Sequence, residues 1–352
     1  MKFMHIADVH LGVQPDRGKS WSQTRAREVS ETFDKLLAIA EEKQVSLLLI
    51  AGDLFHAQPT MAELKELDYK LSKLSRTWTV IIAGNHDYMS PEGAYAKYRF
   101  QTKTVCLPAD RMVSAYIREL GVCVTGRSYD RQEIPEGIYD DARPVREDSI
   151  NFLLAHGGDL THAPLKKQKL LDAGFDYIAL GHIHKPKILV PDKMAYAGSP
   201  EPIDYTDVGD RGYIIGEVTK GHCHIEWKKI NVRNYINLSL KMKPEYSGAQ
   251  IIDAIEKEMK RLGKQHIYRI LLKGQKNDEV QPDFLALTTR YMISMIEDYT
   301  RGALDVEALL AENGENLIGQ FIIQLKDKED VVSKKALEYG LHALLEDGNS
   351  CI

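Results

Sequence analysis

Seven side chains that can bind a metal ion follow short apolar segments of this chain. The segment KFMHIA leads into Asp8 and His10, and SLLLIAG leads into Asp53. Short apolar runs that end abruptly in polar residues are typical of buried strands. Loops beyond the carboxyl ends of such strands form the functional crevice of α/β proteins. The sequence therefore predicts one site with ligands for two metal ions: Asp8, His10, Asp53, Asn85, His156, His182 and His184.

The mixture of oxygen and nitrogen donors indicates which chemistry this site could perform. Such donors suit Mn²⁺, Fe or Zn²⁺, whereas an all-thiolate site would require cysteines that these motifs lack. Two cations roughly 3.5 to 4 Å apart can activate a water molecule and hold both oxygens of an in-line phosphoryl displacement. Two ionised aspartates and two divalent ions leave a centre of about +2, which attracts a phosphodiester.

The histidines of this chain fall into two groups. Any single histidine is more often packed or solvated than a ligand, but coincidence does not explain five consecutive motifs. Six histidines belong to the motifs: His10, His56, His86, His156, His182 and His184. We expect the other six, His5, His162, His222, His224, His266 and His342, to be structural, although His162 lies close to His156. Asn85 and His86 are adjacent and cannot both face one cation from a regular strand, which predicts different roles, and Asp87 is expected to fix the loop.

Helical periodicity separates the first apolar segments. Val29, Phe33, Leu36, Leu37 and Ala40 repeat at helical spacing, as do Leu64, Leu67, Leu71 and Leu74. An order of strand, helix, strand, helix, strand predicts parallel strands joined by crossover helices. RGYIIGEV and HIEWKKINV are predicted as later strands that close the first domain near residue 235.

Two smaller regions are predicted after residue 235. Residues 236–303 contain the strand INLSLKM, a helix over 250–262, the strand HIYRILLKG and a helix over 284–299. Residues 304–352 are predicted to be helical, with apolar stripes at Leu317, Phe321, Leu325, Leu337, Leu341 and Leu344. Such stripes usually pack in a core, and a groove for a partner is the alternative.

Composition excludes several classes of protein. The chain has 352 residues, of which 43% are hydrophobic and 28% charged, as in ordinary globular proteins. No apolar run approaches the ~18 residues of a membrane span, and the first ten residues are too short and too soon charged for a signal peptide. Cys106, Cys123, Cys223 and Cys351 are widely spaced. We therefore expect reduced thiols and a cytoplasmic location.

Charge is unevenly distributed along the chain. The net charge of −5 argues against a protein that simply coats nucleic acid. Residues 236–277 nevertheless carry nine basic against four acidic side chains, and residues 278–352 carry six against fifteen. Either both regions are solvated surfaces, or the basic segment contacts phosphates while the acidic one faces something else.

The motifs DVH, GDLFH, GNHD, AHG and GHIH, in this order, resemble the signature of the calcineurin-like metallophosphoesterases. That resemblance implies an α/β fold with a two-sheet sandwich flanked by helices. MKFMHIADVHLG, GDLFH with His56, and AYAGSPEPIDY are similar to the SbcD-type DNA-repair nucleases, the bacterial relatives of the meiotic-recombination double-strand-break nuclease. The motif match covers residues 1–218. Beyond them only the layout is similar, with a small α/β capping domain and a helical C-terminal tail.

The resemblance implies a role for each residue of the site. Asp8, His10, Asp53 and His184 would hold one ion, and Asp53, Asn85, His156 and His182 the other. His86 would be the catalytic histidine that stabilises the transition state and protonates the leaving oxygen, and His56 would lie beside it and orient it. The two ions would most often be Mn²⁺ in this family.

The resemblance also implies an activity and partners. Members of the family are Mn²⁺-dependent exonucleases on double-stranded DNA ends and endonucleases on single strands or hairpins. They act as homodimers with an SMC-like coiled-coil ATPase of the SbcC type, which binds the C-terminal helices. The candidate contacts with DNA phosphates are Arg17, Lys19, Lys166, Lys167, Lys185, Lys241, Lys260 and Arg261.

Two other functions remain possible from the sequence. The same centre could hydrolyse a small phosphodiester such as a cyclic nucleotide, although such enzymes usually lack a basic capping domain and an acidic helical tail. The chain could also be a binding scaffold with a vestigial centre. Scaffolds of that kind tend to lose ligands, whereas this sequence retains all seven donors and His86.

Overall fold

The computed structural model describes residues 1–277, 279–302, 304 and 306–348. The chain divides into two compact units. Unit one contains Met1–Asn237 together with the short segments Lys264–Arg269 and Tyr291–Met295. Unit two contains Leu238–Gly263, Ile270–Arg290 and the chain from Ile296 onward. All of the strand-end motifs belong to unit one.

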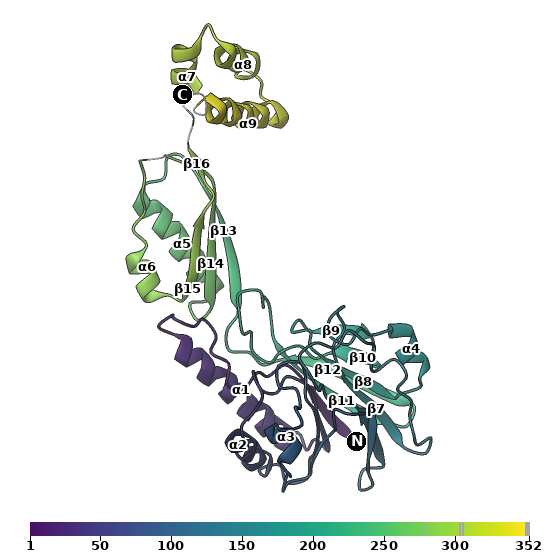
Figure 1. Ribbon diagram of the computed structural model, residues 1–352. Helices are drawn as coiled ribbons and strands as arrows, with labels where there is room; N and C mark the ends of the chain where they lie inside the picture. The colour runs from purple at the N-terminus through teal and green to yellow at the C-terminus, as the bar shows by residue number, and fades with distance from the viewer. Residues whose placement is uncertain (278, 303, 305, 349–352) are drawn as a thin grey trace. The chain divides into compact units, whose positions relative to one another are not determined.

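Two six-stranded sheets form the framework of unit one. The first has the order β12-β11-β1-β2-β3-β4, in which β1 to β4 are parallel. Beside β1, strands β11 and β12 form an antiparallel hairpin, which is labelled in Figure 1. Its strands are β1 (Lys2–Ile6), β2 (Leu47–Ala51), β3 (Trp78–Ile82), β4 (Thr104–Cys106), β11 (Gly212–Thr219) and β12 (His222–Lys229).

The second sheet has the order β5-β6-β7-β8-β10-β9. Its central strands β6, β7, β8 and β10 are parallel, while β5 and β9 run antiparallel at the edges. The strands are β5 (Val113–Ile117), β6 (Val122–Gly126), β7 (Ile150–His156), β8 (Tyr177–Gly181), β9 (Lys187–Val190) and β10 (Met194–Tyr196). Parallel strands in both sheets direct their carboxyl ends, and hence their polar loops, to one edge.

Continuous apolar strands are needed because both faces of each sheet are covered. Leu47, Leu49 and Ala51 of β2 belong to the core between the two sheets, whereas Leu48 and Ile50 pack among helical residues on the outer face. Phe3 lies at the centre of the inner core, with its ring centroid 5.2 Å from that of Phe152 and 5.0 Å from that of Tyr177. Alternate residues of one strand therefore stabilise two different layers.

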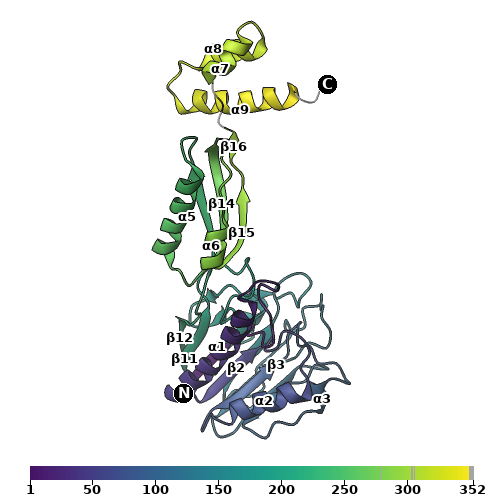
Figure 2. The same ribbon diagram turned by 90° about the vertical axis from the view of Figure 1, so that its left-hand side faces the viewer.

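Helices cover the outer face of the first sheet, as the predicted periodicity requires. α1 (Ser22–Glu42) and α2 (Met61–Leu71) lie against β1, β2 and β3 (Figure 2). Thr60 is the N-cap of α2 and forms a reciprocal capping box with Glu63. Its hydroxyl accepts a hydrogen bond from the Glu63 amide, and the Glu63 carboxylate accepts one from the Thr60 amide. Two short helices complete unit one, α3 (Ala94–Lys97) and α4 (Lys167–Asp172).

A third, four-stranded sheet follows, with the order β13-β14-β15 and with β16 parallel to β14. Its strands are β13 (Tyr235–Met242), β14 (Ile267–Lys276), β15 (Ile293–Asp298) and β16 (Arg301–Gly302), and its helices are α5 (Gly248–Leu262) and α6 (Leu285–Arg290). The predicted helix over 284–299 is correct for Leu285–Arg290 and wrong beyond it. It ends at Arg290 because residues 293–298 pair with β14, and sheet pairing outweighs local helical propensity.

The C-terminal part is helical, as predicted, with α7 (Val306–Asn313), α8 (Leu317–Leu325) and α9 (Val331–Gly348). Ile322 of α8 and Leu341 of α9 are fully buried, whereas Leu317 is 67% exposed. The α/β fold class, with its two-sheet sandwich, small third sheet and C-terminal helices, is therefore confirmed.

Cys106, Cys123 and Cys223 are free thiols, and Cys351 lies outside the described residues. None of the helices in the described part of the chain is long and apolar enough to cross a membrane.

The inner core predicts a specific stability difference. Phe3→Ala should lower the free energy of unfolding of unit one by about 3 to 5 kcal/mol, since it leaves a cavity between two aromatic rings. Tyr69 of α2 is 63% exposed, so Tyr69→Ala should change the free energy of unfolding by no more than about 0.5 kcal/mol. Urea denaturation followed by circular dichroism measures both, and equal effects would contradict the position of Phe3 in the core.

Candidate metal centre

The loops that follow β1 and β2 run side by side at the edge of the first sheet. The amide of Asp8 donates to the carbonyl oxygen of Gly52 at 3.1 Å, and the amide of His10 donates to that of Asp53 at 3.0 Å. Asp8, His10 and Asp53 have φ angles of 54°, 55° and 50°. This left-handed backbone is unfavourable for residues other than glycine and is concentrated at functional sites. It bends both loops sharply at the ends of their strands.

The other donors come from β3 and from the second sheet. Asn85 follows β3, His156 is the last residue of β7, and His182 and His184 follow β8. His182 also has a left-handed backbone, with a φ angle of 92°, and its amide donates to the Asp8 carboxylate at 2.9 Å. The site therefore forms where the two sheets meet, and it requires both.

One group of donors gathers around His10. Nε2 of His10 lies 3.0 Å from Nε2 of His184 and 3.9 Å from Oδ2 of Asp53. Asp8, His10 and His184 each place a ligand atom within 4.8 Å of the others, as is required to hold one ion. All but His184 are buried, and His184 is partly exposed.

A second group gathers around Asn85. Its Oδ1 lies 3.0 Å from Nε2 of His156 and 3.1 Å from Nδ1 of His182. Oδ2 of Asp53 lies 3.4 Å from Nε2 of His156, and thus between this group and His10. That is the position expected of a carboxylate that bridges two cations. The structure brings all seven predicted donors together.

Burial gives these groups unusual protonation equilibria. Loss of hydration raises the pKa of Asp8 to about 6 and that of Asp87 to about 7. Burial would also raise the pKa of Asp53, but His156 and His10 hold it far below its ordinary value. The charge of Asp53 in turn raises the pKa of His156 to about 9 against the effect of burial. Asp53 and His156, 3.4 Å apart, therefore each favour the charged form of the other.

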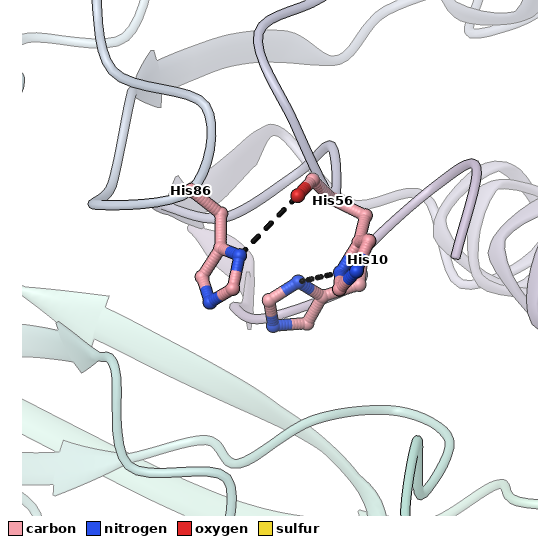
Figure 3. Close-up of side chains that lie close together, drawn as sticks. All are labelled: His10, His56 and His86. Atoms are coloured by element: carbon pink, nitrogen blue, oxygen red, sulfur yellow. Dashed lines mark hydrogen bonds between the residues drawn. The ribbon is translucent and has the colours of Figure 1, made fainter. Parts of the chain in front are cut away.

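His86 lies beside His10 and His56 (Figure 3), and these three histidines also each place a ring nitrogen within 4.8 Å of the others. Its ring centroid is 4.8 Å from that of His10 and 5.2 Å from that of His56. Nδ1 of His86 lies 3.2 Å from the backbone carbonyl oxygen of His56, while Nδ1 of His56 lies 3.4 Å from Nδ1 of His10. His56 therefore contacts His86 through its backbone and by ring stacking.

The loop after β3 lies so close to the donors that a side chain at Gly84 would clash with them. A Cβ atom on Gly84 would lie 2.3 Å from Oδ1 of Asp53 and 2.7 Å from Cε1 of His156. Asp87, as expected, fixes this loop, because its carboxylate accepts the amides of Gly84 at 2.7 Å and Phe55 at 3.2 Å. The loop after β3 is thereby held close to both groups.

Sequence reasoning missed two carboxylates that contact the predicted ligands. Asp207 Oδ2 lies 3.1 Å from Nδ1 of His184, and Asp159 Oδ2 lies 2.7 Å from Nε2 of His182. Asp159 stands three residues after His156, which is a weak local signal. Asp207 lies 23 residues from its histidine, so nothing in the sequence pointed to it. His162, expected to be structural, lies 2.9 Å from the Asp159 carboxylate.

The eight candidate phosphate contacts are all exposed, but they are spread over the chain. Arg17, Lys19, Lys166, Lys167 and Lys185 belong to unit one, and Lys241, Lys260 and Arg261 to unit two. Several have protein partners, as Lys19 donates to the Ser294 carbonyl oxygen and Lys260 and Arg261 pair with Glu256 and Glu258. Side-chain contacts therefore do not distinguish them from ordinary surface residues.

The donor set fits two divalent cations. It combines buried carboxylate, amide and imidazole ligands, which suit ions of intermediate hardness without selecting one of them. An α/β sandwich with such a centre at the carboxyl ends of its strands is the architecture of a metallophosphoesterase.

The chain belongs to the calcineurin-like phosphoesterase family, which residues 1–186 match. Its relatives extend beyond these residues. It is 27% identical to the DNA double-strand break repair protein Mre11 of Methanopyrus kandleri, over 99% of this chain and 83% of that protein. It is 23% identical to Mre11 of Sulfolobus acidocaldarius, over 89% and 85% respectively. The Bacillus subtilis metallophosphoesterase YhaO, which is uncharacterised, is 26% identical over 65% of this chain and 60% of that protein. The resemblance inferred from the motifs is confirmed.

Close packing around Gly84 predicts that an added methyl group disrupts the centre. Gly84→Ala should abolish tight Mn²⁺ binding, measured by isothermal titration calorimetry, because the Cβ atom would displace Asp53 and His156. Gly174→Ala is the matched control. Its φ angle is +88° and its Cβ would meet no atom within 4 Å, so it should cost about 1 to 2 kcal/mol of stability and leave Mn²⁺ binding intact. Normal Mn²⁺ binding by Gly84→Ala would contradict the described packing.

Proposed function

We propose that this chain is a two-metal phosphodiesterase that processes DNA ends as a repair nuclease. The observation that carries the proposal is the convergence of seven donors and His86 at the edge of the two sheets. The names of two relatives, which align with most of this chain, support DNA as the substrate.

In this proposal the donors divide between two ions. Asp8, His10, Asp53 and His184 hold one, and Asp53, Asn85, His156 and His182 hold the other, with Asp53 shared. Divalent ions bound there would activate the attacking water and neutralise the charge of the phosphodiester. Mn²⁺ is the ion that we expect, from the resemblance to the family.

His86 supplies the proton for the leaving oxygen. A carbonyl oxygen can only accept, so Nδ1 of His86 carries a hydrogen and donates it to the His56 backbone. Nε2 is then the nitrogen that exchanges a proton with the substrate, and the imidazolium form is the general acid. The hydrogen bond to the His56 carbonyl oxygen fixes the direction of the ring for this transfer.

The phosphate backbone would be bound by exposed basic side chains. The excess of basic residues over 236–277, including Lys241, Lys260 and Arg261, suits a polyanion and carries no base-reading pattern. Arg17, Lys19, Lys166, Lys167 and Lys185 provide further positive charge in unit one. Binding of this kind depends on the shape and charge of the duplex rather than on its sequence.

A protein partner is proposed for the C-terminal helices. Leu317 and Ile323 of α8 are 67% and 55% exposed, in a region with an acidic excess that disfavours contact with DNA. From the family resemblance, the partner is an SMC-like coiled-coil ATPase, and the nuclease acts as a homodimer. Residues 1–235, 236–303 and 304–352 would then serve as the nuclease, DNA-capping and docking domains.

A comparison of substrates tests the proposed function. With Mn²⁺, the chain should degrade labelled duplex ends and nick hairpins, with or without the ATPase, and it should lose this activity when EDTA removes the metal. Bis-p-nitrophenyl phosphate and cyclic nucleotides test the alternative small substrates. Efficient cleavage of small diesters, with DNA untouched even in the presence of the ATPase, would contradict the nuclease proposal.

His86 and His56 should behave differently when they are substituted. His86→Ala should reduce the cleavage rate by about 10²- to 10⁴-fold, since it removes the general acid, while it leaves Mn²⁺ binding unchanged. His56→Ala keeps the backbone carbonyl oxygen that orients His86, so its loss should be much smaller. Single-turnover cleavage and calorimetric Mn²⁺ titration measure the two properties. Loss of a metal ion in His86→Ala would instead make His86 a ligand.

A further inference from the structure

Each of the two histidines in GHIH directs one ring nitrogen to the centre and the other to a carboxylate. His184 faces His10 with Nε2 and Asp207 with Nδ1. His182 faces Asn85 with Nδ1 and Asp159 with Nε2. Histidines that bind a metal through one ring nitrogen commonly donate a hydrogen bond from the other nitrogen to a carboxylate. The carboxylate then fixes the tautomer and the orientation of the ring.

The two carboxylates are held in different ways. Asp207 is 5% exposed, and its Oδ2 also accepts the amide of Ile203 at 3.0 Å. Its Oδ1 accepts Nη2 of the buried Arg211 at 3.1 Å. In the described part of the chain, the other two nitrogens of that guanidinium have no acceptor. Asp207 is therefore fixed by two contacts besides the one with His184.

Asp159 belongs to an exposed turn. Its side chain is 44% exposed, and its Oδ1 accepts the amides of Thr161 and His162, both at 2.8 Å, and the Thr161 hydroxyl at 3.0 Å. Nδ1 of His162 lies 2.9 Å from its Oδ2, so all of these partners belong to the same turn. The turn itself therefore orients the carboxylate, and water competes for it. His182 thus has a weaker outer support than His184.

We propose that Asp207 and Asp159 are positioning residues that make the two metal sites unequal. Asp207 orients His184 rigidly and strengthens the site formed with Asp8 and His10. Asp159 orients His182 loosely, so that the site formed with Asn85 and His156 binds its ion more weakly. This inference rests on the two-metal centre of the proposed function, but not on DNA as its substrate.

Calorimetric titration of the full chain with Mn²⁺ tests this inference. Asp207→Asn should weaken binding of the tighter ion by roughly 10- to 100-fold. Asp159→Asn should weaken the other ion by a smaller factor. Asp204→Asn is the matched control for both, because Asp204 closes the same kind of turn, accepting the Thr206 amide at 2.7 Å, and no described histidine contacts it. It should bind both ions as the wild type does.

Asp207→Asn also leaves Arg211 without its anion, which could impair folding. The double variant Asp207→Asn/Arg211→Met removes both charges, and it should show the same weakening of the tighter ion. Thermal unfolding followed by circular dichroism confirms that each variant is folded before its titration.

A double-mutant cycle separates positioning from a general structural effect. If Asp207 acts through His184, Asp207→Asn should reduce Mn²⁺ affinity no further in a His184→Ala background. The same should hold for Asp159→Asn in His182→Ala. Additive losses, or equal losses in Asp204→Asn, would overturn the inference. A third bound ion that is lost in both Asp159→Asn and His162→Ala would overturn it for Asp159, because that carboxylate would then be a ligand itself.

The titrations use no nucleic acid, so the two proposals fail separately. Unchanged Mn²⁺ binding in both aspartate variants, with DNA cleaved by the wild type, would overturn only the positioning roles. Unequal binding as expected, with DNA left intact, would overturn only the nuclease function.

Discussion

The metal centre depends on four residues with left-handed backbone, Asp8, His10, Asp53 and His182. Each such residue costs of order 1 to 3 kcal/mol and persists only where its surroundings determine it. Here the parallel register of β1 and β2 continues into their loops, through the hydrogen bonds from Asp8 to Gly52 and from His10 to Asp53. The core of the sandwich thus provides the stability that keeps these unfavourable conformations in place.

Desolvation is the second constraint, and it explains why the centre suits cations. Asp8, Asp53 and Asp87 are all buried within one small region, where carboxylates resist ionisation unless positive charge is nearby. His156, 3.4 Å from Asp53, favours the ionised form of that carboxylate against the effect of burial. Divalent ions neutralise such a region more effectively than a single proton, and they leave the excess positive charge that a phosphodiester requires.

The sequence predicted the fold, and it predicted that the inner side chains lie together at the strand ends, for a physical reason. Buried parallel strands have continuous apolar sequences, so the polar residues at their ends, such as Asp53 and His156, are easily recognised in the sequence. The carboxylates that support the donors have no such signature, because Asp207 reaches His184 only through tertiary folding. The helix expected over 284–299 failed for a related reason, since pairing with β14 converts its second half into a strand. Local patterns cannot report partners that are distant in the sequence.

The seven donors come from both layers of the sandwich. Asp8, His10, Asp53 and Asn85 come from one, and His156, His182 and His184 come from the other. Ions bound by these donors would cross-link the two sheets. Because only the folded chain offers this arrangement, its resistance to heat and to proteases is expected to rise with the free concentration of the metal. The same metal ions would then contribute both to catalysis and to the stability of the folded sandwich.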